Sequence, residues 1–481
     1  MFSEKITTIE QAFSHEEFRE NGHKIVDILA DYLKKAGNRE LDNVLPPISP
    51  MEMLEKWSGE FPEEPTGDFT HLVNKTIELS NHLHHPRYVG HQVTSPLPLA
   101  SLCSLVGSLL NNGNAVYDMG PATTIMERKL ISWMSELIGH EVTGDGFFTS
   151  GGTLGNLTAL LAARQAKTGY DIWTEGAKDS ENLAIMVSEQ CHYSVKRAVC
   201  VMGLGEQAVI PVPALDSFKL DTDQLEIAYA KAVAAGKKVL AVVASACSTA
   251  TGSYDDLLKV GAFCKEKDIW FHVDGAHGAS ALLSNKYKHL LNGIDMADSL
   301  VWDTHKMMLM PALNTAVIFK NPHNSYEAFS QRASYLFEND AREEWYNMAH
   351  RTMECTKLMM GFTVYTCLSV YGTKFFGNYI DQVYDLTKAF AKVIGESSDF
   401  EVAIEPECNI ICFRYTAKEE CDIDALQFDL RKKLLAEGSY YLVQTELNGK
   451  AYMRCTIINP FTSIDDLRAL LERVRFFVRV A

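Results

Sequence analysis

Lys306 ends a short polar segment, residues 303–306, that directly follows an apolar run expected to form a β-strand. A lysine in such a place can act as an imine-forming amine if its pKa is lowered. A lone lysine is more often a solvated surface charge. Here the apolar residues 300–302 and 307–311 on either side argue against that alternative. Lys306 is therefore a candidate nucleophilic amine.

A glycine-rich turn, Thr149–Asn156, precedes a segment whose leucines have helical spacing. Glycines allow backbone N–H groups to approach a phosphate, and a helix N-terminus adds positive potential. Ser150 and Thr153 would add hydroxyl donors. The P-loop pattern, GxxxxGK followed by Ser or Thr, is absent. On its own, this turn is compatible both with a phosphate site and with a capped turn that only starts a helix.

A third segment, His272–Ala279, also follows an apolar run. Asp274 should lie at the carboxyl end of its strand, where open α/β sheets bind ligands. One possibility is a metal site made of His272, Asp274 and His277. Another is a carboxylate that holds a cationic ring nitrogen, and a third is a polar strand end with His272 in the core. This segment alone leaves all three open.

The combination of the three segments is more specific than any one of them. A phosphate cradle, a carboxylate and a strand-end lysine are what pyridoxal 5′-phosphate (PLP) requires. The carboxylate keeps the pyridine nitrogen protonated and the lysine forms the imine. Metal-dependent hydrolysis would explain the second segment only. We therefore expect PLP as cofactor and no metal.

The elements that must position these segments form an alternating pattern. Apolar runs predict strands, and several are apolar throughout, as in strands covered on both faces. Helical segments lie between them, which indicates a largely parallel α/β sheet. The predicted strands of this part are Leu183–Val187, Val239–Ala244, Ile269–Val273, Leu300–Trp302 and Thr315–Phe319, with helices at Leu225–Ala235 and Leu257–Lys265.

The two ends of the chain have a different character. At the N-terminus, Ser14 and Glu17 indicate a helix start, and residues 46–65 indicate an extended connection. A long helix is expected from Arg351 to about Tyr371, and the last ~110 residues mix strands and helices, as in a small α+β domain. We expect a helical arm (1–80), a large PLP-binding domain (81–365) and a small C-terminal domain (366–481).

The composition of the chain excludes some classes of partner and indicates a cellular compartment. The chain has 481 residues, 47% of them hydrophobic, and a net charge of −17. The acidic balance disfavours nucleic acid and anionic membranes as partners. Eleven scattered cysteines, with no CxxC pair, indicate reduced thiols. The first ten residues contain no apolar signal-peptide core, and no apolar run reaches membrane-spanning length. These features predict a cytoplasmic protein.

Several ordered blocks of this sequence resemble the PLP-dependent group II amino-acid decarboxylases of fold type I. The likeness runs from about Leu83 to the C-terminus. The segment from His85 to Pro121 looks most similar to L-2,4-diaminobutyrate decarboxylases. The blocks are His85–Tyr88, Thr149–Asn156, Ser188–Ser194, His272–Ala276, Asp303–Lys306 and Arg454 with Ile458–Pro460.

The resemblance implies roles for individual residues. Lys306 would form the imine with PLP, Asp274 would pair with the pyridine nitrogen, and His192 would stack on the ring and assist proton transfer. Arg454 would receive the substrate carboxylate; a surface ion pair is its alternative. The remaining cofactor contacts implied are Gly152, Thr153, Ser248, Ala276, Asp303 and His305.

Two positions depart from the family pattern or are ambiguous. Asp303 is often asparagine in the family, and an acid beside a phosphate is unexpected. The family's mobile loop carries a tyrosine that protonates the substrate carbon after CO2 leaves. Here that loop falls near residues 330–350, and Tyr346 is preferred over Tyr335 because the latter lies in an apolar run.

The function that the resemblance implies is decarboxylation of an L-amino acid to the amine and CO2. The substrate would be 2,4-diaminobutyrate or an acidic amino acid, with an aromatic one also open. Another fold type I enzyme, an aminotransferase or carbon–sulfur lyase, is the alternative. The family also implies a homodimer with active sites at the interface, which suits an N-terminal arm whose apolar stripe needs a partner.

Overall fold

The structure of the protein is a computed structural model that describes residues 8–64, 69–140, 144–178, 180–329, 344–416 and 422–480. The chain divides into two compact units. The larger unit comprises residues 92–388 and 404–411. The smaller unit comprises residues 1–91, 389–403 and 412–481.

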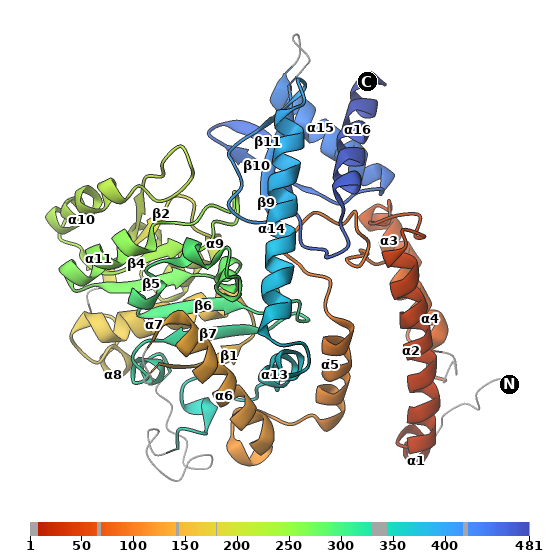
Figure 1. The fold of residues 1–481 in the computed structure, drawn as a ribbon. Helices are drawn as coiled ribbons and strands as arrows, with labels where there is room; N and C mark the ends of the chain where they lie inside the picture. The colour runs from red at the N-terminus through yellow and green to blue at the C-terminus, as the bar shows by residue number, and fades with distance from the viewer. Residues whose placement is uncertain are drawn as a thin grey trace. The chain divides into compact units, whose positions relative to one another are not determined.

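A seven-stranded sheet organises the larger unit, in the order β1-β7-β6-β5-β4-β2-β3 (Figure 1). Strands β3, β2, β4, β5 and β6 are parallel, whereas β7 is antiparallel to both β6 and β1. The strands are β1 (Asp145–Thr149), β2 (Leu183–Ser188), β3 (Val209–Val212), β4 (Lys238–Ser245), β5 (Trp270–Asp274), β6 (Ser299–Asp303) and β7 (Thr315–Phe319). This confirms the predicted α/β class, and β2 and β4–β7 are the five strands expected from apolar runs.

Helices of this unit pack on the sheet or on other helices. They are α5 (Pro98–Leu110), α6 (Pro121–Ile138), α7 (Gly152–Thr168), α8 (Ile172–Glu175), α9 (Tyr193–Val201), α10 (Leu225–Ala234), α11 (Leu257–Lys267), α12 (Asn324–Glu327) and α13 (Met360–Tyr371). Helices α7 and α11 pack on the sheet, whereas α5 packs on α13. Helix α14 (Thr373–Gly395) begins in the larger unit and ends in the smaller one. None of the helices in the described part of the chain combines the length and apolar character needed to cross a membrane.

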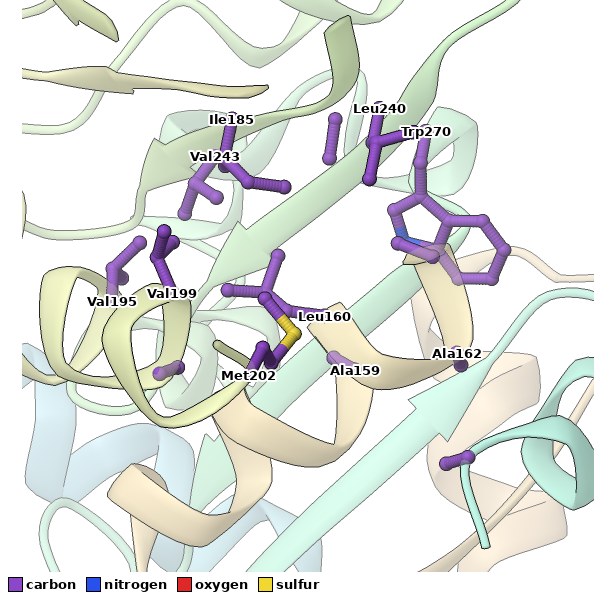
Figure 2. Packing of buried hydrophobic residues seen from close by; sticks show 14 of the residues in the cluster. Ala159, Leu160, Ala162, Ile185, Val195, Val199, Met202, Leu240, Val243 and Trp270 are labelled. Atoms are coloured by element: carbon purple, nitrogen blue, oxygen red, sulfur yellow. The ribbon is translucent and has the colours of Figure 1, made fainter. Parts of the chain in front are cut away.

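Helix α7 lies at the centre of the main core. Figure 2 shows Ala159, Leu160 and Ala162 of α7 among side chains from neighbouring strands and from α9. These neighbours are Ile185, Val195, Val199, Met202, Leu240, Val243 and Trp270. Because α7 packs across β4, β5, β6 and β7, its N-terminal turn is held in place by the same core.

The smaller unit contains a four-stranded sheet in the order β10-β11-β9-β8. Its strands are β8 (Phe400–Val402), β9 (Ile410–Tyr415), β10 (Val443–Leu447) and β11 (Lys450–Thr456). Helix α15 (Ile423–Glu437) packs on β11, and α16 (Ile464–Arg479) packs on α15. The N-terminal helices of this unit are α1 (Ile9–Ala12), α2 (His15–Gly37), α3 (Pro50–Lys56) and α4 (Thr70–Glu78).

Helix α2 begins where the sequence indicated. The hydroxyl of Ser14 accepts the backbone N–H of Glu17 and caps the helix. Only Ala36 is buried among the 23 residues of α2. Of the apolar stripe, Phe18 and Leu29 are exposed, and Ile25 and Ile28 are only half-buried by this unit.

Two local predictions were wrong. Residues 46–65 are not simply extended, because Pro50 and a capping box between Ser49 and Glu52 start helix α3. The helix expected from Arg351 begins only at Met360. Residues 351–359 instead form turns and bends. Two buried ion pairs hold this segment in place, Arg351 with Asp145 and Lys357 with Glu127.

Candidate active site

A cavity of about 420 Å³ lies in the larger unit where several strands end. Asp274 is the last residue of β5 and Asp303 the last of β6. Parallel strands present their carboxyl ends at one edge of a sheet, where ligands of open α/β folds bind. The predicted residues that line this cavity are Gly152, Thr153, His192, Asp274, Ala276, Asp303, His305 and Lys306.

Asn156 of α7 fixes the Asp274 carboxylate. Its Nδ2 donates to Asp274 Oδ2 at 2.9 Å, and its Oδ1 lies 2.9 Å from Nε2 of His272. Because an amide oxygen accepts, His272 must donate from Nε2. His272 Nδ1 then accepts the hydroxyl of Ser299, which itself accepts the indole N–H of Trp270. A buried chain of hydrogen bonds therefore runs from Trp270 to Asp274.

His272 is thus a core residue and not a ligand. Its side chain is completely buried, both ring nitrogens are used, and burial lowers its pKa to about 4. Among the residues that the structure describes, no group of three His, Cys, Asp or Glu side chains is placed to hold a metal ion.

His192 is positioned by the same asparagine. It caps the N-terminus of α9, and its Nδ1 lies 2.7 Å from the hydroxyl of Ser194. Ser194 Oγ also accepts the second hydrogen bond from Asn156 Nδ2, at 2.9 Å. Its hydroxyl proton is therefore directed to His192. Burial lowers the pKa of His192, against the opposing effect of Asp274, so a neutral ring with its proton on Nε2 is favoured.

Lys306 and Asp303 form an ion pair in the cavity, with Nζ 2.8 Å from Oδ2. Thr315 donates to the other carboxylate oxygen at 2.6 Å. Burial would raise the pKa of Asp303, but the charges of Lys306 and His305 outweigh it and the pKa is lowered. Burial would likewise lower the pKa of Lys306, but Asp303 and Asp274 raise it. The lysine is therefore held as an ammonium group.

The glycine-rich turn opens directly onto this ion pair. Gly151 has a φ of +102°, which favours glycine, and α7 begins at Gly152. A Cβ on Gly152 would lie 3.1 Å from both carboxylate oxygens of Asp303. Glu354 braces the turn, because its Oε1 accepts the hydroxyls of Thr149 and Ser150 at 2.8 and 3.1 Å. The N-terminus of α7 therefore faces the cavity beside the carboxylate of Asp303, where its positive potential favours negative charge.

Two predicted residues, Ser248 and Tyr346, do not line this cavity. Ser248 is buried, but its hydroxyl points to the carbonyl of Gln190 at 3.5 Å, and its neighbours Cys247 and Thr249 line the cavity instead. Tyr346 is not among the lining residues; its ring packs edge-to-face on Tyr117, with centroids 5.3 Å apart. Tyr335 lies outside the described residues.

Arg454 belongs to the smaller unit. It lies on β11, is 8% exposed, and its Nη2 is 3.4 Å from the hydroxyl of Thr456. The role expected for it, binding of the substrate carboxylate, stays a prediction.

Sequence reasoning missed several lining residues, which are Asn156, Ser194, Arg197, Cys247, Thr249, His277 as a wall residue, and Leu313. Asn156 and Ser194 lie inside blocks that the resemblance already identified, so their polarity beside a predicted helix was an available signal. Arg197 follows His192 by five residues on α9. Its place on the cavity depends on which face of α9 packs inward.

Comparison with known proteins assigns the family. Residues 57–416 match the model described as the pyridoxal-dependent decarboxylase conserved domain. The chain belongs to this family. It is a PLP-dependent amino-acid decarboxylase.

Individual relatives agree with this assignment. The chain is 27% identical over 470 residues to an aromatic-L-amino-acid decarboxylase of Bacillus atrophaeus, covering 96% of this chain and 95% of the relative. It is 30% identical over 489 residues to an aspartate 1-decarboxylase of Aliivibrio fischeri, covering 90% and 88%.

A solved structure is similar over nearly the whole chain. It is the glutamate decarboxylase domain of a diaminobutyrate-pyruvate transaminase and L-2,4-diaminobutyrate decarboxylase from Vibrio parahaemolyticus. The TM-score is 0.86 at 25% identity, with 99% of this chain and 98% of the other covered. This likeness confirms the fold type I architecture.

The cavity suits this cofactor. Asp274 is a buried carboxylate whose orientation is fixed by Asn156, as a partner of a pyridinium nitrogen must be. The amine of Lys306 reaches the same cavity, and Gly152 and Thr153 at the N-terminus of α7 line it, where backbone N–H groups could hold a phosphate. PLP supplies an electron sink that stabilises the negative charge left when CO2 departs.

Proposed function

We propose that this decarboxylase acts on an L-amino acid with an acidic side chain. The observation that carries the proposal is the charge balance of the cavity. Among the described lining residues, Arg197 is a cation with no carboxylate partner, and its guanidinium lies over the Tyr193 ring at 4.7 Å. The other permanent cation, Lys306, is paired with Asp303.

The cavity offers no free carboxylate to pair with a cationic substrate side chain. The carboxylates among the described lining residues are Asp274 and Asp303. Asp274 accepts hydrogen bonds from Asn156 and from the backbone N–H of Ala276, and it is the partner proposed for the pyridine nitrogen. Asp303 holds Lys306. Diaminobutyrate would therefore find an unpaired cation and no unpaired carboxylate on this wall.

The proposed roles of the other side chains are those that the resemblance to the family implies. Lys306 would supply the amine that attaches the cofactor. Asp274 keeps the pyridine nitrogen protonated. His192, with its proton on Nε2, lines the cavity, where it would face the cofactor ring and carry a proton. Gly152, Thr153 and His305 would hold the phosphate. The aspartate 1-decarboxylase relative supports an acidic substrate.

A substrate panel tests the proposal. The holoenzyme is incubated with L-aspartate, L-glutamate, L-cysteine sulfinate, L-2,4-diaminobutyrate and L-tryptophan, and CO2 release is measured. The highest kcat/KM is expected for an acidic substrate. Arg197 is exposed at the rim of the cavity, so Arg197→Met should raise KM for that substrate about threefold, as expected for loss of an exposed ion pair, whereas Arg197→Lys should retain most binding. A preference for diaminobutyrate that Arg197→Met leaves unchanged would overturn it.

A separate experiment tests the site assignment. The purified protein should be yellow, and Lys306→Ala should remove both the imine absorption band and CO2 release. Formation of a keto acid in place of CO2 would instead point to an aminotransferase.

We further propose a cytoplasmic homodimer with active sites at the interface. Helix α5 exposes Leu102, Leu105 and Leu109, with about half or more of each side chain accessible. Leu313 lines the cavity and is 55% exposed, so a second subunit covering it would help to close the site. The described cysteines are all free thiols, in keeping with a reducing compartment. A solution mass of one chain, 53.7 kDa, would contradict the dimer.

A further inference from the structure

Asn409 does not line the cavity but contacts His277, which does, and Met307, the neighbour of Lys306. It is fully buried, and its Oδ1 lies 2.8 Å from Nε2 of His277, which lines the cavity. Its Nδ2 lies 3.4 Å from the sulfur of Met307, which does not line the cavity but follows Lys306, which does. His277 follows Ala276, another lining residue. Each contact is therefore one residue away from a group assigned to the cofactor.

The preceding residue adds a third contact. Cys408 Sγ lies 3.8 Å from Cys247 Sγ, and Cys247 lines the cavity. The segment is anchored in turn by Glu407, whose carboxylate accepts the backbone N–H of Tyr254 at 2.9 Å and pairs with Lys219 at 2.7 Å. Residues 404–411 belong to the larger unit, although the chain on both sides of them belongs to the smaller one.

The two contacts of Asn409 also determine how its amide is turned. The NH2 group is directed to sulfur, so the oxygen must face His277 and accept from its Nε2. His277 is 2% exposed, and this bond fixes its ring and its tautomer. A nonpolar residue at position 409 would remove this acceptor from the buried imidazole.

We propose that Asn409 is a positioning residue of the cofactor site. Its side-chain amide links the turn that carries Ala276 to the turn that carries Lys306, so that both keep the spacing that the cofactor needs. The proposal rests on PLP being the cofactor but not on the substrate class. Its tests therefore measure cofactor binding and not turnover.

The first test compares apoenzyme variants by titration with PLP, followed by absorbance and by visible circular dichroism of the bound cofactor. Asn409→Ala is expected to weaken PLP binding about tenfold and to reduce the dichroic band. Gln427→Ala is the matched control, because Gln427 is a buried amide of the smaller unit that bonds the backbone of Tyr415. It should lower stability without changing the band.

The second test breaks the same contact from the other side. His277→Leu should weaken PLP binding, whereas His277→Gln, which can still donate to Asn409, should retain most of it. In the double variant Asn409→Ala/His277→Leu the losses should be much smaller than the product of the single losses. If Asn409→Ala does not fold, the PLP affinities of His277→Leu and His277→Gln test the proposal by themselves. Three results would overturn the proposal. Asn409→Ala could bind PLP with the affinity and dichroism of the parent, or His277→Leu and His277→Gln could lose the same amount of PLP affinity. The third is a double variant whose loss of PLP affinity equals the product of the two single losses.

Discussion

Asn156 holds the Asp274 carboxylate at 2.9 Å while its amide oxygen accepts from the fully buried His272. The same Nδ2 group also donates to Ser194, whose hydroxyl lies 2.7 Å from His192. One amide therefore orients both the group proposed to hold the pyridine nitrogen and the group proposed to stack on the ring.

Asn156→Ala should therefore impair both functions. The variant leaves Asp274 and His272 without their shared partner, and loss of such a buried hydrogen bond costs about 1–3 kcal/mol. PLP affinity should fall about tenfold or more, and kcat should fall with it. Thr158→Ala is the control, because this hydroxyl on the same helix bonds only the Leu154 carbonyl among the contacts described. Equal PLP affinities of Asn156→Ala and Thr158→Ala would count against this arrangement.

Asp303→Asn should make Lys306 a more available amine. The carboxylate raises the pKa of Lys306, so its removal lowers that pKa and increases the neutral amine fraction at a given pH. The rate at which apoenzyme forms its imine band with PLP should reach half-maximum at a lower pH, by about one unit or more. Thr315→Val, which removes a hydrogen bond to Asp303 but keeps its charge, should shift this midpoint much less. An unchanged midpoint in Asp303→Asn would show that the Asp303 carboxylate does not raise the pKa of Lys306.

The sequence predicted the parts of this site that depend on strand ends. Asp274 and Lys306 could be placed because each follows an apolar run, and runs covered on both faces indicate parallel strands whose ends converge. Contacts that depend on how distant segments pack could not be placed in this way. Asn409 is 132 positions from its partner His277, and no local spacing signals that pairing.

Local patterns failed where buried charges override them. Residues 351–359 have a helix-compatible sequence, yet Arg351 pairs with Asp145 and Lys357 with Glu127, more than 200 positions away in each case. Leaving one of these buried charges without its partner would cost about 3–5 kcal/mol, whereas helix propensity contributes only about a few tenths of a kcal/mol per residue. The β-strand β1, which contains Asp145, was missed because its run is short and rich in polar residues at its ends.

Lys357→Met should destabilise the fold strongly. Lys357 and Glu127 are both completely buried, and Glu127 also accepts the Phe148 backbone N–H at 2.9 Å. Removing one partner of a buried ion pair leaves an uncompensated charge and costs about 3–5 kcal/mol. The double variant Lys357→Met/Glu127→Gln should recover part of this loss, and the exposed Lys129→Met should change stability by less than about 0.5 kcal/mol. Urea unfolding of the apoenzyme measures all three, and equal losses in the single and double variants would exclude the buried-charge explanation.

Acid should weaken the fold through its buried histidines. Burial lowers the pKa of His272 to about 4 from an ordinary value of 6.5, so the unfolded chain binds more protons between these values. The free energy of unfolding should therefore fall as the pH drops from about 6.5 towards 4, with no contribution from His272 above pH 7.5. His85 and His140 act in the same direction, since burial also lowers their pKa values to about 4.

The contribution of His272 can be isolated by substitution. His272→Gln should be less stable than the parent at pH 7.5, because one of the two ring hydrogen bonds is lost. It should, however, lose about 2 kcal/mol less than the parent between pH 7.5 and pH 5, because no titrating group remains at this position. Urea unfolding of both apoenzymes at the two pH values gives this difference. Equal losses in parent and variant would show that His272 does not stay neutral in the folded protein.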